Sequence, residues 1–370
     1  MSTSRLYFLD NLRAFVIFLV VVLHGALTYM AYAPEWWYVL DPQNSLFFTA
    51  VVLLVDVPIM LMMFFVAGYF AYPSLSRRGA AGFVREKFTR IGLPWIFGAL
   101  VLAPPTAYMI YYSRGVPVSL GQFWASDFWG PLYQQSVYWY LGILFLFFVL
   151  LAAGYNFSAR LRGLTQKNIP PTLATFILFF GLTTVAAGLV NLYSSLDTWS
   201  NNYLFVYQPV RAPLYVGYFA LGVYAYLRGW FTTEGYSPSL WRWLALCVVS
   251  GLVYLGYRFT VPLPAQTSFV LKSVTVILFN LFCLSSLMAG LAVFRRYVNG
   301  QGAFWQGQAR NSYGVYYLHP LFLYPLALLF VPLSISIFLK APAIILLAWV
   351  ASWAVSALAL TRLPGLRRIF

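Results

Sequence analysis

The chain has 370 residues, of which 62% are hydrophobic, 20% are aromatic and only 8% are charged. Because soluble domains carry about 25% charged residues, this composition excludes a soluble protein and is typical of a polytopic helical membrane protein. The net charge of +15 reflects 8 acidic against 23 basic residues, which is a scarcity of acid and not a dense basic face. We therefore expect a lipid bilayer, and no nucleic acid, as a partner.

Apolar stretches of roughly 20 residues, each long enough to cross about 30 Å of hydrocarbon, predict about ten transmembrane helices. They cover approximately residues 12–33, 46–72, 91–112, 137–156, 172–193, 210–228, 241–260, 270–294, 312–332 and 341–361. The expected fold is an all-α polytopic membrane protein with one transmembrane domain over residues 1–370. No internal repeat supports an inverted-repeat transporter.

The first apolar stretch has two interpretations. Ala31, Tyr32 and Ala33 have the pattern of a signal-peptide cleavage site. Arg13 interrupts the start of the stretch and Pro34 follows the cleavage pattern, so we predict a helix that is retained.

The distribution of basic residues predicts that both termini lie in the cytoplasm. With the N-terminus inside, most of the 23 Lys and Arg residues fall at the cytoplasmic ends of the predicted spans, as the positive-inside rule requires. Most basic residues are therefore interpreted as orientation signals. One cluster is denser than orientation needs and is a candidate anion site: Arg77, Arg78, Arg85, Lys87 and Arg90.

The chain has only two histidines, and both fall at similar depth inside predicted helices. At 1.5 Å per residue, His24 lies about 16 Å beyond Arg13, and His319 lies about 12 Å beyond Asn311. Ionisable groups inside a membrane are costly and persist where they line a cavity or pair with one another. Each histidine is thus a functional candidate, the alternative being a buried imidazole held by a backbone carbonyl. Two histidines with so few carboxylates predict no metal site.

Three further ionisable residues are candidates. Asp56 lies well inside the second predicted helix, where it can orient a histidine or pair with an arginine. Asp10 and Arg13 can pair on one helix face, or Arg13 can reach an anionic ligand. The outer tryptophans are predicted either to stack on sugar rings or to form the usual interfacial belt: Trp36, Trp37, Trp124, Trp129 and Trp199.

Several short motifs follow one another along almost the whole chain. They are YFLDNLR at 7–13 with His24 beyond it, FFVAGYF at 64–70, REKFTRIGLP at 85–94, VYWYL at 137–141 and SYGVYYLHP at 312–320. Together they resemble the acyltransferase-3 family of integral membrane O-acyltransferases, most closely its branch of glucan succinyltransferases. Two positions depart from the family pattern. Ala67 stands where the family has Ser, and Lys87 stands where it has the first Arg of an Arg-x-x-Arg pair.

The resemblance implies transfer of an acetyl, succinyl or similar group from a cytoplasmic acyl-CoA to a hydroxyl of a glycan or other acceptor. A hydroxyl needs a positioned base that titrates near neutrality, so we predict that His24 is the general base. An acyl-His intermediate stays an open alternative. Arg13 is expected to grip the pantetheine end or to stabilise the developing oxyanion. The predicted catalytic residues are His24, Arg13, Asp10, His319 and Asp56.

The same resemblance singles out Lys87 and Arg90 as the central pair of the donor site. The phosphates of acyl-CoA are expected to bind the basic cluster, where Arg binds bidentately and Lys acts as a point charge. The predicted donor-binding residues are Lys87, Arg90, Arg85, Arg77 and Arg78. We expect a multi-pass protein of the bacterial cytoplasmic (inner) membrane that uses no metal.

The alternative function is a proton-coupled transporter or flippase with His24, Asp56 and His319 as a proton relay. The basic cluster before Pro94 favours the enzyme, because a proton-coupled carrier has no need of a polyanion site. The sequence leaves the acyl group, the acceptor and the oligomeric state open.

Overall fold

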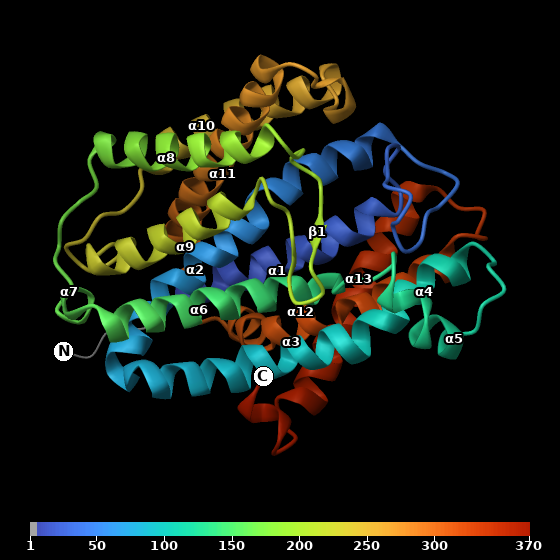
Figure 1. Cartoon of the computed structure of the whole chain (residues 1–370), viewed down its shortest axis with the longest axis horizontal. Helices are drawn as coiled ribbons and strands as arrows, with labels where there is room; N and C mark the ends of the chain where they lie inside the picture. The colour runs from blue at the N-terminus through green and yellow to red at the C-terminus, as the bar shows by residue number, and fades with distance from the viewer. Residues whose placement is uncertain (1–5) are drawn as a thin grey trace.

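Helices make up almost all of the regular structure in residues 6–370, the part of the chain that the computed structural model describes (Figure 1). The α-helices are α1 (Tyr7–Leu27), α2 (Leu46–Lys87), α3 (Leu93–Phe97), α4 (Ala103–Ser113), α5 (Leu120–Ala125), α6 (Trp139–Phe157), α7 (Ala159–Arg162), α8 (Leu173–Asn191), α9 (Ala212–Leu227), α10 (Leu240–Thr260), α11 (Phe269–Tyr297), α12 (Ala303–Phe330) and α13 (Ile337–Val355).

Short segments of other geometry connect these helices. The π-helical segments are η1 (Phe88–Gly92), η2 (Gly98–Leu102) and η6 (Ser356–Leu360). The 3₁₀ turns are η3 (Asp127–Trp129), η4 (Ser136–Tyr138), η5 (Leu263–Ala265) and η7 (Leu366–Arg368). Among the described residues the only strands, β1 (Ser200–Asn201) and β2 (Val206–Tyr207), form one small antiparallel pair.

Eight helical segments of the described chain are long and apolar enough to cross a membrane. One of them runs for 68 residues from Leu46 to Ser113, far beyond the roughly 20 residues that a crossing needs, and it contains two of the predicted stretches. The shorter apolar helix α9 covers a further stretch. The predicted all-α polytopic membrane fold is therefore confirmed, while the cytoplasmic placement of both termini stays a prediction.

The long segment reverses its direction at Gly79, inside α2. Gly79 has φ 70° and ψ 166°, a conformation that is essentially restricted to glycine. In Figure 1 the first part of α2 and the segment leading into α3 and α4 run in opposite directions. The break separates two crossings and places the basic cluster, residues 77–90, at the turn between them.

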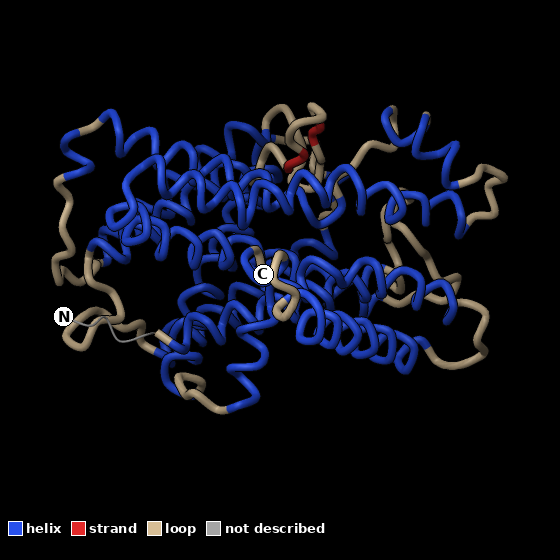
Figure 2. Tube along the Cα trace, turned by 90° about the horizontal axis from the view of Figure 1, so that it is seen from below, coloured by secondary structure: helices blue, strands red, loops and turns tan. Residues whose placement is uncertain are grey.

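The interior is built around α1, which packs against α2, α11, α12 and α13. The outer helices α8 and α10 bury only 11% and 22% of their most apolar windows, so their remaining apolar side chains are available to lipid. Figure 2 shows that most helices run side by side, roughly along the long axis of the molecule, with the small strand pair at the periphery.

Two glycines allow α2 and α9 to approach closely. A Cβ atom at Gly68 would collide with the carbonyl oxygen of Phe219, and one at Gly222 would collide with the carbonyl oxygen of Phe65. Small residues of this kind let helix backbones meet within a membrane. The glycine of the FFVAGYF motif thus has a packing role.

Residues 28–45 form a strap that folds back from the end of α1 to the start of α2. Because of this strap α1 ends at Leu27, earlier than predicted. The Asp41 N–H donates to the Thr28 carbonyl at 3.0 Å, which closes the strap on itself. The Asp41 carboxylate pairs with Lys340 of α13 at 2.9 Å, and both side chains are 1% exposed. A fully buried ion pair therefore ties the strap to α13.

Candidate active site

The two histidines of the chain meet at the contact between α1 and α12. His24 Nδ1 and His319 Nε2 lie 2.9 Å apart, and the two rings are close to parallel. His319 is fully buried, whereas His24 is partly accessible. The structure thus brings together the two residues that the sequence placed at similar depth.

The hydrogen bonds of His319 determine which ring nitrogens of the pair carry protons. His319 Nδ1 lies 2.8 Å from the Tyr316 carbonyl oxygen, which can only accept, so we assign the proton to this nitrogen. With neutral rings, His319 Nε2 is then an acceptor, and His24 Nδ1 must donate to it. His24 Nε2 is left with a free lone pair and can act as a base.

The strap places an indole ring over this pair. Trp37 stacks on His24 with ring centroids 5.6 Å apart and an interplanar angle of 17°. Arg114, just beyond α4, donates to the carbonyl oxygens of Glu35 at 2.6 Å and of Trp37 at 3.0 Å, which fixes this part of the strap. Trp37 is buried against His24, and so it has neither of the two surface roles predicted for it.

An open pocket of about 300 Å³ lies at the turn after Gly79. Its lining consists of Gly82, Arg85, Glu86, Thr89, Arg90 and Arg368. Glu86 holds the cluster together, since Arg78 and Arg90 lie 3.0 Å and 3.8 Å from its carboxylate. Three guanidinium groups around one pocket suit a polyanionic ligand.

Lys87 does not line this pocket, although its ammonium group lies 3.9 Å from the Glu86 carboxylate. Its ammonium group lies over the rings of Phe83 and Phe148, at 5.3 Å and 5.2 Å from their centroids. The structure brings Arg85 and Arg90 of the predicted donor set into the pocket. Arg77, Arg78 and Lys87 do not line it.

Helix α12 connects the pocket to the histidines. The Tyr313 hydroxyl donates to the Arg90 carbonyl at 2.8 Å, and the Tyr317 hydroxyl donates to the Pro94 carbonyl at 2.9 Å. Tyr313 and His319 are on the same helix, so at 1.5 Å per residue the rise between them is about 9 Å. Helix α12 thus links the segment that lines the arginine pocket to the histidine pair.

Asp10 and Arg13 lie together near the start of α1. Arg13 Nη2 is 3.4 Å from Asp10 Oδ1 and donates to the Ala309 carbonyl oxygen at 3.4 Å. The helical rise from Arg13 to His24 is about 16 Å. The predicted pair is thus formed, and it lies toward the other end of α1 from the histidines.

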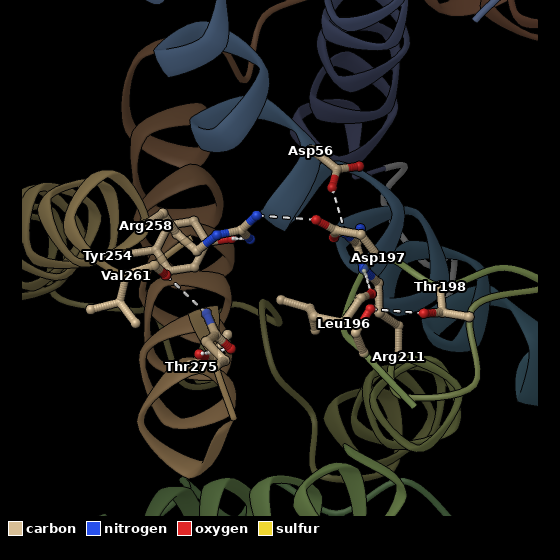
Figure 3. A network of polar contacts seen from close by, with 11 residues as sticks. Asp56, Leu196, Asp197, Thr198, Arg211, Tyr254, Arg258, Val261 and Thr275 are labelled. Carbon is tan, nitrogen blue, oxygen red and sulfur yellow. Dashed lines mark hydrogen bonds and ion pairs between the residues drawn. The ribbon is translucent and has the colours of Figure 1, made fainter. Parts of the chain in front are cut away.

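Asp56 belongs to a different polar network, which Figure 3 draws. Its carboxylate lies 2.6 Å from Arg211, which also contacts Asp197 at 2.7 Å, and Asp197 in turn contacts Arg258 at 3.1 Å. Burial alone would raise the pKa of Asp197, but the two guanidinium groups hold this pKa below its ordinary value. Of the two roles predicted for Asp56, the structure contains the pairing with an arginine. Its assignment to catalysis stays a prediction.

Residues 6–360 match the acyltransferase-3 family, described as "Acyltransferase domain". The chain belongs to this family. Together with the apolar helices, the match places it among multi-pass membrane proteins of this family. The family expected from the sequence motifs is therefore confirmed.

The chain is also similar to proteins named glucans biosynthesis protein C. The protein of Shigella boydii serotype 4 (strain Sb227) is 29% identical over 112 residues, which cover 30% of this chain and 28% of that protein. The protein of Escherichia coli O81 (strain ED1a) is 22% identical over 249 residues, which cover 64% of this chain and 63% of that protein. The matched segments thus span less than two thirds of these relatives. No solved structure matches the chain.

Two residues at the site were not predicted from the sequence. Arg368 joins the arginine pocket from the C-terminal turn η7, and its place in a basic tail marked it only as an orientation signal. Tyr324 packs edge-on against Trp37 with ring centroids 5.6 Å apart. Tyr324 is five residues beyond His319 on α12, a spacing that puts the two side chains on different faces of the helix, so the sequence carried no signal for it.

Proposed function

We propose that this membrane acyltransferase moves an acyl group from a cytoplasmic acyl-CoA to a hydroxyl of a glycan or another extracytoplasmic acceptor. His24 is the general base. The observation that carries this proposal is the hydrogen bond between His24 Nδ1 and His319 Nε2, which leaves His24 Nε2 as the basic atom.

The chemistry follows from this arrangement. An alcohol is a weak nucleophile near pH 7, and a base within hydrogen-bond distance raises its reactivity as it attacks. His24 takes the proton of the acceptor hydroxyl at Nε2. His319 accepts the hydrogen bond from Nδ1 and thereby stabilises the imidazolium that forms. The hydroxyl oxygen attacks the thioester carbonyl, and the departing thiolate of CoA receives the proton from His24.

The donor side of the proposal rests on the arginine pocket. The phosphates of CoA carry several negative charges, and Arg85, Arg90 and Arg368 offer guanidinium groups in one place. The pantetheine arm would extend from this pocket along α12 toward His319. Acetyl-CoA and succinyl-CoA are the donors that we propose.

The acceptor and the location are inferred from relatives. Two similar proteins carry names that refer to glucan biosynthesis, which favours a glycan acceptor. The corresponding location is the bacterial inner membrane, with the donor pocket on the cytoplasmic side. The oligomeric state is left open.

The direct test incubates the purified protein in detergent with labelled acetyl-CoA or succinyl-CoA and a panel of glycans. We expect the label to appear on an acceptor as an alkali-labile ester. The same protein in vesicles under a pH gradient tests the alternative of a proton-coupled transporter. Proton movement without ester formation would contradict the proposal.

Loss of a pocket arginine is expected to weaken donor binding without changing the chemical step. Arg90→Gln and Arg368→Gln each remove one charge-assisted contact, so the KM for acyl-CoA should rise about tenfold while kcat stays close to that of the wild type. Titration of the initial rate against acyl-CoA measures both quantities. Arg160→Gln, on α7 and outside the pocket, is the matched control. Unchanged KM values in both pocket variants would place the donor site elsewhere.

A further inference from the structure

Two buried polar atoms, one on the ring that stacks on His24 and one on the ring packed against it, have no hydrogen-bond partner among the described residues. They are the indole nitrogen Nε1 of Trp37 and the hydroxyl oxygen of Tyr324. Trp37 is 4% exposed and Tyr324 is fully buried. Buried polar groups are nearly always hydrogen-bonded, because an unmade bond costs free energy. Two such donors on adjoining rings therefore need an explanation.

Ring packing holds Trp37 on His24 and Tyr324 on Trp37. Trp37 stacks on His24, and Tyr324 meets the Trp37 ring edge-on, at an interplanar angle of 87°. Tyr38 stacks on Tyr324, with ring centroids 4.2 Å apart. The Tyr38 hydroxyl is itself satisfied, since it donates to Gln134 Oε1 at 2.6 Å. The unpaired donors are thus held by a rigid aromatic cluster.

The proposed reaction creates a negative charge that needs such donors. When the acceptor oxygen bonds to the thioester carbon, the carbonyl π electrons move to oxygen and form a tetrahedral oxyanion. Donors that are fixed in place before the reaction stabilise this charge most effectively, because no reorganisation is required in the transition state. An indole N–H can only donate, and a tyrosine O–H can donate as well as accept.

We propose that the Trp37 N–H and the Tyr324 O–H form the oxyanion hole for acyl transfer. This inference rests on the proposed function. His24 Nε2 removes the hydroxyl proton as the new C–O bond forms, and the two donors bind the resulting oxyanion. The oxyanion then collapses, the C–S bond breaks, and His24 returns the proton to the thiolate of CoA. The products are the acyl ester and free CoA, so that atoms and charge balance.

Arg13 was the sequence-based candidate for this role. It lies about 16 Å along α1 from His24 and is engaged by Asp10 and the Ala309 carbonyl. Trp37 stacks on the base, Tyr324 packs against Trp37, and neither polar atom has a competing partner in the described part of the chain. The geometry therefore favours these two residues.

Tyr324→Phe tests the inference, because it removes one hydroxyl and keeps the packed ring. We expect kcat to fall about 100-fold, in the range observed when an enzyme loses one oxyanion donor. The acceptor KM and the Kd for acyl-CoA should stay within about twofold of the wild type. Trp37→Phe, which retains an aromatic ring over His24 without the N–H, should likewise lower kcat. Folding of both variants is checked by size-exclusion chromatography in detergent.

Tyr29→Phe is the matched control. The Tyr29 hydroxyl is also buried without a partner, but its ring packs on Phe48 and not on Trp37. An equal loss of kcat in Tyr29→Phe and Tyr324→Phe, or a kcat for Tyr324→Phe within about threefold of the wild type, would overturn the oxyanion assignment. A wild-type protein that forms no ester would instead overturn the proposed function itself.

Discussion

His24→Ala is expected to lower the kcat of acyl transfer by about 1000-fold, within the range that general-base catalysis provides. Without the imidazole, the acceptor hydroxyl has no base beside it, and the departing thiolate has no proton donor. The proposed donor pocket is lined by none of the residues around His24, so binding of acyl-CoA should be unchanged. Initial rates and acyl-CoA binding measured on the same preparation separate these two effects.

Thr28→Val provides the control for a general disturbance of this end of α1. The Thr28 hydroxyl is buried without a partner among the described residues, so its removal should leave kcat within about twofold of the wild type. Partial rescue of His24→Ala by added imidazole would strengthen the assignment of a base. Activity of His24→Ala within tenfold of the wild type would contradict it.

Lys340→Met is expected to destabilise the protein by about 3–5 kcal/mol, because it leaves the Asp41 carboxylate buried without its charged partner. The pair lies at 2.9 Å with both side chains 1% exposed. Lys340 also donates to the Val331 carbonyl at 3.0 Å, a contact that methionine cannot replace. Unfolding of the purified variant in a denaturing detergent, followed by its circular dichroism, measures the loss. The strap should loosen at the same time and lower transferase activity.

The control for this effect is Lys272→Met. Lys272 makes a 3.3 Å contact with the Leu192 carbonyl and has no carboxylate partner in the described chain, so its loss should cost less than about 1 kcal/mol. The double variant Lys340→Met/Asp41→Leu should be more stable than Lys340→Met alone, because no unpaired charge remains. Equal stability of Lys340→Met and Lys272→Met would show that the buried pair does not hold the strap.

Hydropathy predicted the membrane class and the approximate crossings, because the length of an apolar stretch is a local property of the sequence. The predicted helix boundaries were wrong where the chain turns. The first helix was predicted beyond Leu27 because the strap that follows is itself apolar, and its fold depends on Lys340, which lies 299 positions from Asp41. A contact of that separation leaves no local pattern.

The candidate site was predictable only in part, because depth along a helix is a local property of the sequence and contacts between helices are not. Counting residues along two helices placed His24 and His319 at similar depth, but it could not tell which faces of α1 and α12 meet. The basic cluster indicated an anion site, whereas the inward position of Lys87 depends on the rings of Phe83 and Phe148 around it. Asp56 pairs with Arg211, which lies at the start of another predicted stretch, so no spacing along the chain indicated this contact.

The central claim is that neutral His319 orients His24 and leaves its Nε2 atom free as the base. The most direct test compares the rate of ester formation by His319→Gln, His319→Asn and His319→Ala. The glutamine amide oxygen reaches the position of His319 Nε2 and can accept from His24 Nδ1, whereas the shorter asparagine cannot reach it. We predict that His319→Gln retains at least about tenfold more activity than the other two variants, since it alone preserves the tautomer of the base. Equal rates for all three variants would contradict this account.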